Sequence, residues 1–142
     1  MKKLIFLPVL LLIMVSLFSV SANAQVTKAT KATVSNSPKV EVYYFHFTRR
    51  CATCQAVESE SLKAITALYP AQSKKGTITF KSVNLDEKTS AALAKKCNAE
   101  GQSLLVISGN KRIDLTEKGF MYALTKPESL KKELKKTIDP LL

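Results

Sequence analysis

Apolar and polar positions divide the chain into three stretches with different patterns. Residues 4–20 form an almost continuous apolar run. Residues 25–38 are dominated by Thr, Ser, Lys and Asn and show no apolar period, which is typical of a flexible linker. From residue 39 onward, apolar side chains recur at the spacings of strands and helices. The pattern therefore predicts one folded domain over residues 39–142, long enough for a single modest core.

Within this domain the pattern predicts four strands and three helices. Residues 40–47 are almost continuously apolar, as in a strand buried on both faces, and residues 77–85 alternate. Two shorter strands are joined through a hairpin turn at residues 108–111. In chain order the predicted elements are strand 40–47, helix 51–69, strand 77–85, helix 86–96, strands 103–107 and 112–115, and a last helix that reaches residue 138.

Local signals place the helix ends. Pro70 lies just past the first helix, and Asp86 is a candidate N-cap of the second. Thr125 and Glu128 have the spacing of a capping box for the last helix. In that helix an apolar stripe lies opposite several lysines, which favours a packed face with a solvated side over a docking surface. The stripe consists of Leu130, Leu134 and Ile138.

The order of the elements predicts the fold class. Strands that alternate with helices indicate a parallel strand–helix–strand core, and the hairpin adds antiparallel strands at one side. We therefore expect an α/β fold, a three-layer α/β/α sandwich around a mixed four-stranded sheet.

The first 24 residues have the layout of a secretory signal peptide. Lys2 and Lys3 precede the apolar run, and Ala22-Asn23-Ala24 gives the small-x-small pattern of a cleavage site. The alternative is an uncleaved anchor, but the run falls short of the roughly 20 residues of a spanning helix. We expect export to the periplasm or the exterior, without stable membrane insertion after cleavage.

Charge and composition narrow the classes of partner. The chain carries a formal net charge of +11, spread along its length, and no basic stripe is interleaved with aromatic residues. We therefore expect a solvated basic surface and no nucleic-acid partner. With only four glycines the chain leaves no room for a nucleotide-binding fingerprint, so we expect no flavin, nicotinamide or other cofactor.

Cys51 and Cys54 lie three residues apart at the start of the first predicted helix. This spacing brings two sulfurs into bonding range, and a helix N-terminus stabilises a thiolate. Arg49 and Arg50 add positive charge beside Cys51, and Thr53 either tunes the thiolate through its hydroxyl or fills space. We interpret the pair as redox-active, with Cys51 as the attacking sulfur and Cys54 as the resolving one.

Two other interpretations of the pair stay open. One is an inert structural disulfide, and the other is a two-thiolate site for a soft metal ion or a trivalent metalloid. Zinc needs four ligands, and only His46 and Cys97 remain, at no ligand-like spacing. We expect Cys97 to be a buried, inert thiol and His46 to be a hydrogen-bonded histidine on the sheet face opposite Phe45 and Phe47.

The CxxC between the first strand and the first helix, in this order of elements, resembles the thioredoxin fold over residues 40–142. "VNLDE" (83–87) and "KKCNAEGQSLLVI" (95–107) are similar to the stretches where that superfamily enters the second helix and the third strand. "YYFHFTRRCATCQAVE" (43–58) is most similar to the small exported ArsF-type family, whose members are labelled subunits of a nitrophenyl-compound nitroreductase. The resemblance implies a thiol–disulfide oxidoreductase.

The sequence departs from the thioredoxin pattern at several positions. Ala52-Thr53 replaces Gly-Pro between the cysteines, and Arg50 replaces a tryptophan. Ser103 stands at the position of the superfamily's cis-proline, where we expect a trans bond and a hydroxyl that can reach the sulfur. Phe45 stands at the position of a buried acid. These departures imply a more specialised substrate than a general protein disulfide.

The expected function is thiol–disulfide exchange with a partner protein that carries a reactive thiol or disulfide. The alternatives are a non-catalytic accessory subunit, for example of a nitroreductase system, and a thiol-based binder of a soft metal or metalloid. Any nitroreductase activity requires another subunit to supply the cofactor.

Overall fold

The computed structural model describes residues 39–142, so the predicted signal peptide (1–24) and linker (25–38) lie outside the described residues. The helices are α2 (Ala52–Leu68), α3 (Pro70–Lys74), α4 (Ala91–Lys96), α5 (Thr116–Tyr122) and α6 (Pro127–Ile138). The strands are β1 (Val40–His46), β2 (Ile78–Asn84), β3 (Ser103–Ser108) and β4 (Lys111–Asp114). Short 3₁₀ turns cover Lys88–Ser90 and Asp139–Leu141. In this part of the chain no helix combines the length and apolar character needed to cross a membrane.

The strands form one mixed sheet in the order β2-β1-β3-β4. β1 runs parallel to β2 and antiparallel to β3, and β4 runs antiparallel to β3. Tyr44 in the middle of the sheet is paired with Ser82 on one side and Leu104 on the other. Together with helices on both faces this is the thioredoxin-like α/β fold, and the predicted fold class is confirmed.

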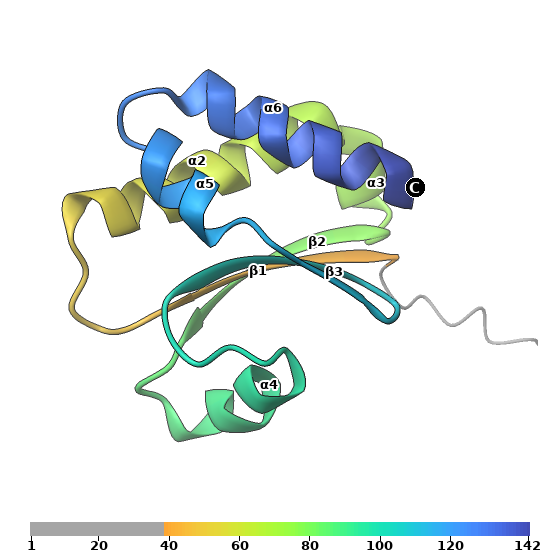
Figure 1. The fold of residues 1–142 in the computed structure, drawn as a ribbon. Coiled ribbons are helices and arrows are strands. Elements are labelled where there is room, and N and C mark those ends of the chain that lie inside the picture. Colours follow the sequence, from red (N-terminus) through yellow and green to blue (C-terminus); the bar gives the residue numbers. More distant parts are fainter. Residues whose placement is uncertain (1–38) are drawn as a thin grey trace, which may run out of the picture. The chain divides into compact units, whose positions relative to one another are not determined.

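The two faces of the sheet carry cores of different size. Figure 1 shows α2, α5 and α6 on one face and α4 on the other. The larger core, on the α2 side, includes Val42 and Tyr44 of β1 and Leu134 of α6, all fully buried. The smaller core, on the α4 side, consists of Tyr43, Phe45, Val83, Ala94, Cys97 and Leu105. β1 is thus buried on both faces, which explains its continuous apolar sequence.

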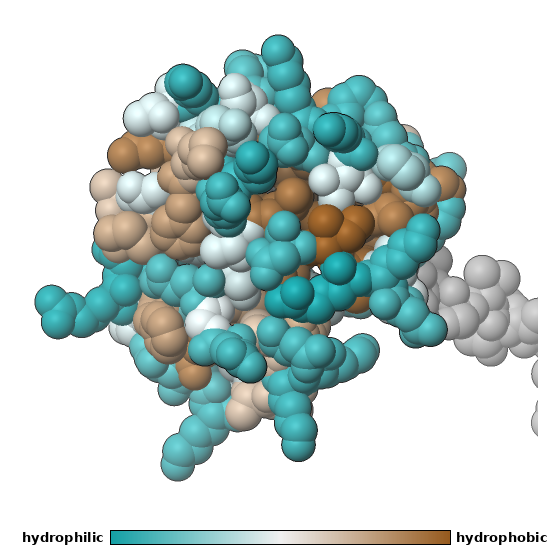
Figure 2. Space-filling model, in the orientation of Figure 1, coloured by the Kyte–Doolittle hydropathy of each residue, from teal (hydrophilic) through white to brown (hydrophobic). Residues whose placement is uncertain are grey.

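Helix α6 packs as its pattern predicts. Leu130, Leu134 and Ile138 are fully buried, and the lysines between them are exposed or half-buried. Figure 2 shows hydrophilic side chains that project across the visible face, with apolar side chains interspersed among them.

Pro70 lies just past the end of α2, as predicted, and opens the short helix α3, where its missing N–H would be unpaired in the first turn anyway. Two other predicted helix boundaries are wrong. Asp86 does not cap α4, since its carboxylate is engaged by the loop after β1. Thr125 and Glu128 form no capping box, because the N-cap residue of α6 is Lys126 and a proline fills the first helical position.

Helix α5 was not predicted. It is seven residues long, and Gly119 in its interior breaks any readable apolar period. A Cβ at Gly119 would lie 3.3 Å from Leu104 Cδ2 and from Val57 Cγ1. The glycine therefore lets α5 approach both β3 and α2 closely, and this requirement cannot be read from local pattern.

Candidate functional site

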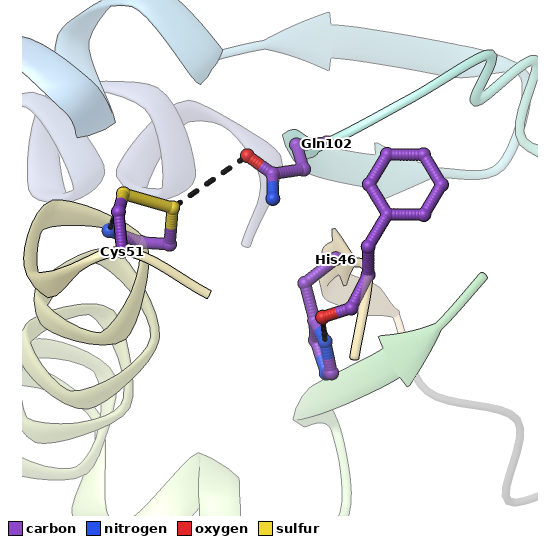
Figure 3. Close-up of a disulfide and its surroundings, with 5 residues drawn as sticks. His46, Cys51 and Gln102 are labelled. Atoms are coloured by element: carbon purple, nitrogen blue, oxygen red, sulfur yellow. Dashed lines mark hydrogen bonds between the residues drawn. A yellow bond between two sulfur atoms is a disulfide. The ribbon is translucent and has the colours of Figure 1, made fainter. Parts of the chain in front are cut away.

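Cys51 and Cys54 form a disulfide at the N-terminus of α2, with their Cα atoms 5.1 Å apart. Cys51 is the N-cap residue of the helix, and its Sγ accepts a hydrogen bond from the backbone N–H of Cys54 at 3.1 Å. Cys51 is exposed, whereas Cys54 is only 4% exposed. The disulfide (Figure 3) therefore joins an exposed residue to a buried one.

The helix start is built to favour a thiolate at Cys51 once the disulfide is reduced. The N–H groups of the first turn have no partner within the helix, and one of them points at the Cys51 sulfur. Hydrogen bonds to an ionised sulfur favour the charged form, as does the positive end of the helix dipole. These contacts would stabilise a Cys51 thiolate after reduction of the disulfide.

The guanidinium of Arg50 forms an ion pair with the carboxylate of Glu58, two turns into α2. Each side chain keeps about a quarter of its exposure, 26% for Arg50 and 27% for Glu58. Burial acts to raise the pKa of Glu58, but hydrogen bonds from Ser82 and Arg50 outweigh it and the pKa is lowered. Arg50, which was predicted to support Cys51, therefore shares its charge with Glu58.

The other two predicted supporting residues near the disulfide take simpler positions. Arg49 lies in the loop before Cys51 and is exposed, and Thr53 is half-buried within the first turn of α2. Their supporting role at Cys51 stays a prediction.

The hydroxyl of Ser103 is bonded within its own segment of the chain. Its Oγ donates to the carbonyl of Gly101 at 3.1 Å, and no cis peptide bond occurs among residues 39–142, so the expected trans bond is confirmed. The side chain that reaches the disulfide from this segment is Gln102, whose Oε1 lies 3.7 Å from Cys54 Sγ. Gln102 was missed because the contact spans 48 residues of sequence.

Side chains of β1 alternate beneath the site. Phe45 points into the smaller core, away from α2, and Tyr44 lies beneath α2 with its ring 5.8 Å from that of His46. His46 is thus on the face opposite Phe45, as predicted, and its Nδ1 donates to the carbonyl of Phe47 at 2.9 Å. Burial raises the pKa of Tyr44 to about 12, and its hydroxyl has no hydrogen-bond partner within the described structure.

The loop between β1 and the disulfide is held by the end of β2. The backbone N–H of Thr48 donates to Asp86 Oδ2 at 2.8 Å, and Asn84 Nδ2 donates to the Thr48 hydroxyl at 3.0 Å. The bonds from Thr48 lower the pKa of Asp86. Phe47, 41% exposed, belongs to this anchored loop between β1 and the disulfide.

Cys97 is separate from this site. It is 4% exposed in the smaller core and is not part of a disulfide, and burial raises the pKa of its thiol. This agrees with the predicted buried thiol. Across the described residues, no cluster of three or more His, Cys, Asp or Glu side chains is arranged to hold a metal ion.

Comparisons with known proteins do not identify a family for the chain. No family model and no curated protein matches the sequence. Among solved structures, a malarial protein is 20% identical with a TM-score of 0.44, over 69% of this chain and 96% of its own. The germline-specific thioredoxin Deadhead of Drosophila melanogaster is 16% identical with a TM-score of 0.45, over 71% of this chain and 83% of its own. Mitochondrial thioredoxin 3 of Saccharomyces cerevisiae, in its oxidised form, is 20% identical with a TM-score of 0.44, over 71% and 81%. Since these values are low, the fold assignment rests on the strand order and on the helices that cover each face of the sheet.

Proposed function

We propose that the protein is an exported thiol–disulfide oxidoreductase that exchanges electrons with a partner protein through Cys51 and Cys54. The observation that carries the proposal is the asymmetry of the pair, with an exposed sulfur at the start of a 17-residue helix and a buried sulfur one turn later. An inert staple has no need of an exposed sulfur that receives a helix N–H.

The reaction proceeds in two exchange steps. In the reduced protein, the Cys51 thiolate attacks one sulfur of a partner disulfide, the partner S–S bond breaks, and the other partner sulfur leaves as a thiolate and takes up a proton. Cys54 then gives up its proton and attacks Cys51 Sγ, the mixed disulfide breaks, and the second partner sulfur leaves and is protonated. Two electrons pass from the dithiol to the partner, and the reverse sequence oxidises a partner dithiol.

The exposure of the two cysteines supports the role proposed for each sulfur. Cys51 can meet a bulky partner because it is exposed, whereas the buried Cys54 is bonded to Cys51 and is proposed to act only on that sulfur. Phe47 and Arg49 are exposed in the loop that leads to Cys51, and we expect a partner to contact this loop.

A Cys54→Ser variant tests the proposal by trapping the partner. In extracts of the native cell envelope it should accumulate a mixed disulfide between Cys51 and one or a few proteins, and dithiothreitol should release them. The matched control is Cys51→Ser, which keeps the buried sulfur and should trap nothing. If both variants trap the same proteins, or neither traps any, the exchange function is wrong.

The second candidate is a non-catalytic accessory subunit of the ArsF-type nitroreductase family, supported by the resemblance of residues 43–58. A subunit of this kind keeps the disulfide static, so it should co-purify with its partner without a mixed disulfide. A two-thiolate binder of a soft metal is distinguished by metal that is retained on purification of the reduced protein and lost in Cys51→Ala.

A further inference from the structure

We propose that Gln102 is a positioning residue whose side-chain oxygen accepts a hydrogen bond from the Cys54 thiol and thereby favours the reduced state of the pair; this rests on the proposed function. Gln102 directly precedes β3 and lies 48 residues after Cys54 in the sequence, yet its Oε1 is 3.7 Å from Cys54 Sγ. Figure 3 shows its amide directed at the disulfide from the β3 segment.

The contact changes its character when the disulfide is reduced. In the oxidised pair Cys54 Sγ carries no hydrogen, so the amide oxygen of Gln102 has no S–H donor from which to accept a hydrogen bond. Reduction adds two electrons, breaks the S–S bond and places a proton on Cys54. The new S–H then faces an amide oxygen, which is a good acceptor for a thiol donor.

The burial of Cys54 makes this acceptor matter. With 4% of its surface exposed, the Cys54 thiol has little access to water, and a buried donor without a partner is destabilising. Among the described side chains, Gln102 is the hydrogen-bonding group placed at this sulfur. A hydrogen bond formed only in the dithiol form shifts the equilibrium toward that form.

Ser103 cannot take over this task, because its hydroxyl is committed to the Gly101 carbonyl at 3.1 Å. Gln102 is half-buried, which limits the freedom of its side chain without removing it from water. The amide is therefore held near the sulfur at little cost in conformational entropy on reduction.

The test compares Gln102→Leu and Gln102→Glu with Gln55→Leu in the full chain. Gln55 is the matched control, since it is an exposed glutamine directly after Cys54. Each protein is equilibrated at one pH in buffers that contain reduced and oxidised dithiothreitol in graded ratios. The free thiols are then alkylated, and the fraction of protein with the Cys51–Cys54 disulfide is measured by mass spectrometry. Dithiothreitol reduces a disulfide whether or not a biological partner exists, so this result is independent of partner trapping.

We expect Gln102→Leu to shift the equilibrium toward the disulfide by about 2- to 5-fold, the size of one net hydrogen bond to a weak thiol donor. At about 30 mV per tenfold change for a two-electron couple, this is roughly 10 to 20 mV. Gln102→Glu keeps an acceptor oxygen and should leave the equilibrium in place or move it toward the dithiol. Gln55→Leu should change nothing.

Two results would overturn the inference. In the first, Gln102→Leu and Gln102→Glu shift the equilibrium equally and in the same direction. In the second, Gln102→Leu matches Gln55→Leu. Urea unfolding of the oxidised variants separates a redox effect from a loss of fold, and if the leucine variant does not fold, Gln102→Met against Gln102→Glu supplies the same comparison.

Discussion

The two ends of helix α2 differ. At its N-terminus the exposed Cys51 accepts a hydrogen bond from a backbone N–H, whereas at its C-terminus the buried Tyr69 donates its hydroxyl hydrogen to another side chain. The hydroxyl of Tyr69 donates to Asp139 Oδ1 at 2.6 Å, and Lys135 pairs with Asp139 Oδ2 at 2.5 Å. Burial, together with Asp139, raises the pKa of Tyr69 well above its usual range. Polar groups are thus left open to a partner at one end and satisfied within the fold at the other.

This difference separates chemistry from stability along one helix. Substitutions at the start of α2 should change the reactivity of the disulfide more than the free energy of unfolding. Substitutions at its end, or in the α6 stripe that packs on it, should do the opposite. Substitutions at both ends of the helix and in the core test that separation.

Cys51→Ser should reduce disulfide exchange with a protein substrate by about 100-fold or more, because the exposed nucleophile is lost. The measurement is the rate at which each reduced protein reduces an exposed disulfide of a substrate protein. Cys97→Ala is the control at a buried thiol and should change this rate by less than about twofold. Comparable losses in both variants would place Cys97 in the reaction.

Leu134→Ala should lower the free energy of unfolding by about 2 to 5 kcal/mol, since it leaves a cavity in the larger core. The measurement is urea denaturation of the oxidised protein. Leu62, 47% exposed on α2, gives the control, and Leu62→Ala should cost about 0.5 kcal/mol or less. The exchange rate of the folded Leu134 variant should stay within a few-fold of the unmodified protein.

Tyr69→Phe removes the hydroxyl that donates a hydrogen bond to Asp139, and the loss of this bond should lower the melting temperature by a few degrees. The bonds from Lys135 and Tyr69 lower the pKa of Asp139, so this stabilisation is present above the unfolded pKa near 4 and disappears as the pH falls through the lower folded value. The melting difference between the two proteins should therefore shrink at acid pH. An equal difference at pH 7 and pH 2 would contradict the assigned bond.

Glu58→Gln should release Arg50 from its ion pair and make Cys51 more reactive at low pH, with half-maximal alkylation shifted down by a few tenths of a pH unit. The pKa of Glu58 is lowered in the fold, so the variant should also lose the stability that this carboxylate supplies above about pH 4. Glu60→Gln, which breaks a pair with the exposed Lys63, is the control. Identical alkylation profiles for both variants would remove Arg50 from the site.

Much of the fold could be predicted from the sequence because it depends on the spacing of apolar and turn residues over short stretches of the chain. The continuous apolar run of β1, the stripe of Leu130, Leu134 and Ile138, and the hairpin turn at Gly109, whose φ is 57°, each depend on neighbours within a few residues. The sequence-based prediction was wrong where a contact between distant segments determines a helix boundary. Asp86 looks like a helix cap, but the loop after β1 takes its carboxylate.

Only those features of the site that depend on neighbouring residues in the sequence could be predicted. Cys51 and Cys54 were identified by their spacing and by the strand before them, and alternation placed His46 opposite Phe45. Which face α2 covers is not a local property, so the position of Tyr44 beneath the helix could not be read. The approach of Gln102 to Cys54 likewise requires β3 to lie beside β1.

The central claim is that the start of α2 prepares Cys51 for attack, and its most direct test is the pH dependence of Cys51 alkylation. The reduced protein is treated with iodoacetamide across the pH range, and modification of Cys51 is followed by mass. We expect half-maximal alkylation of Cys51 at a pH at least about one unit below 8.5, the pKa of an unperturbed thiol, with Cys54 modified far more slowly. Half-maximal reactivity at or above 8.5, or equal rates at the two cysteines, would contradict it.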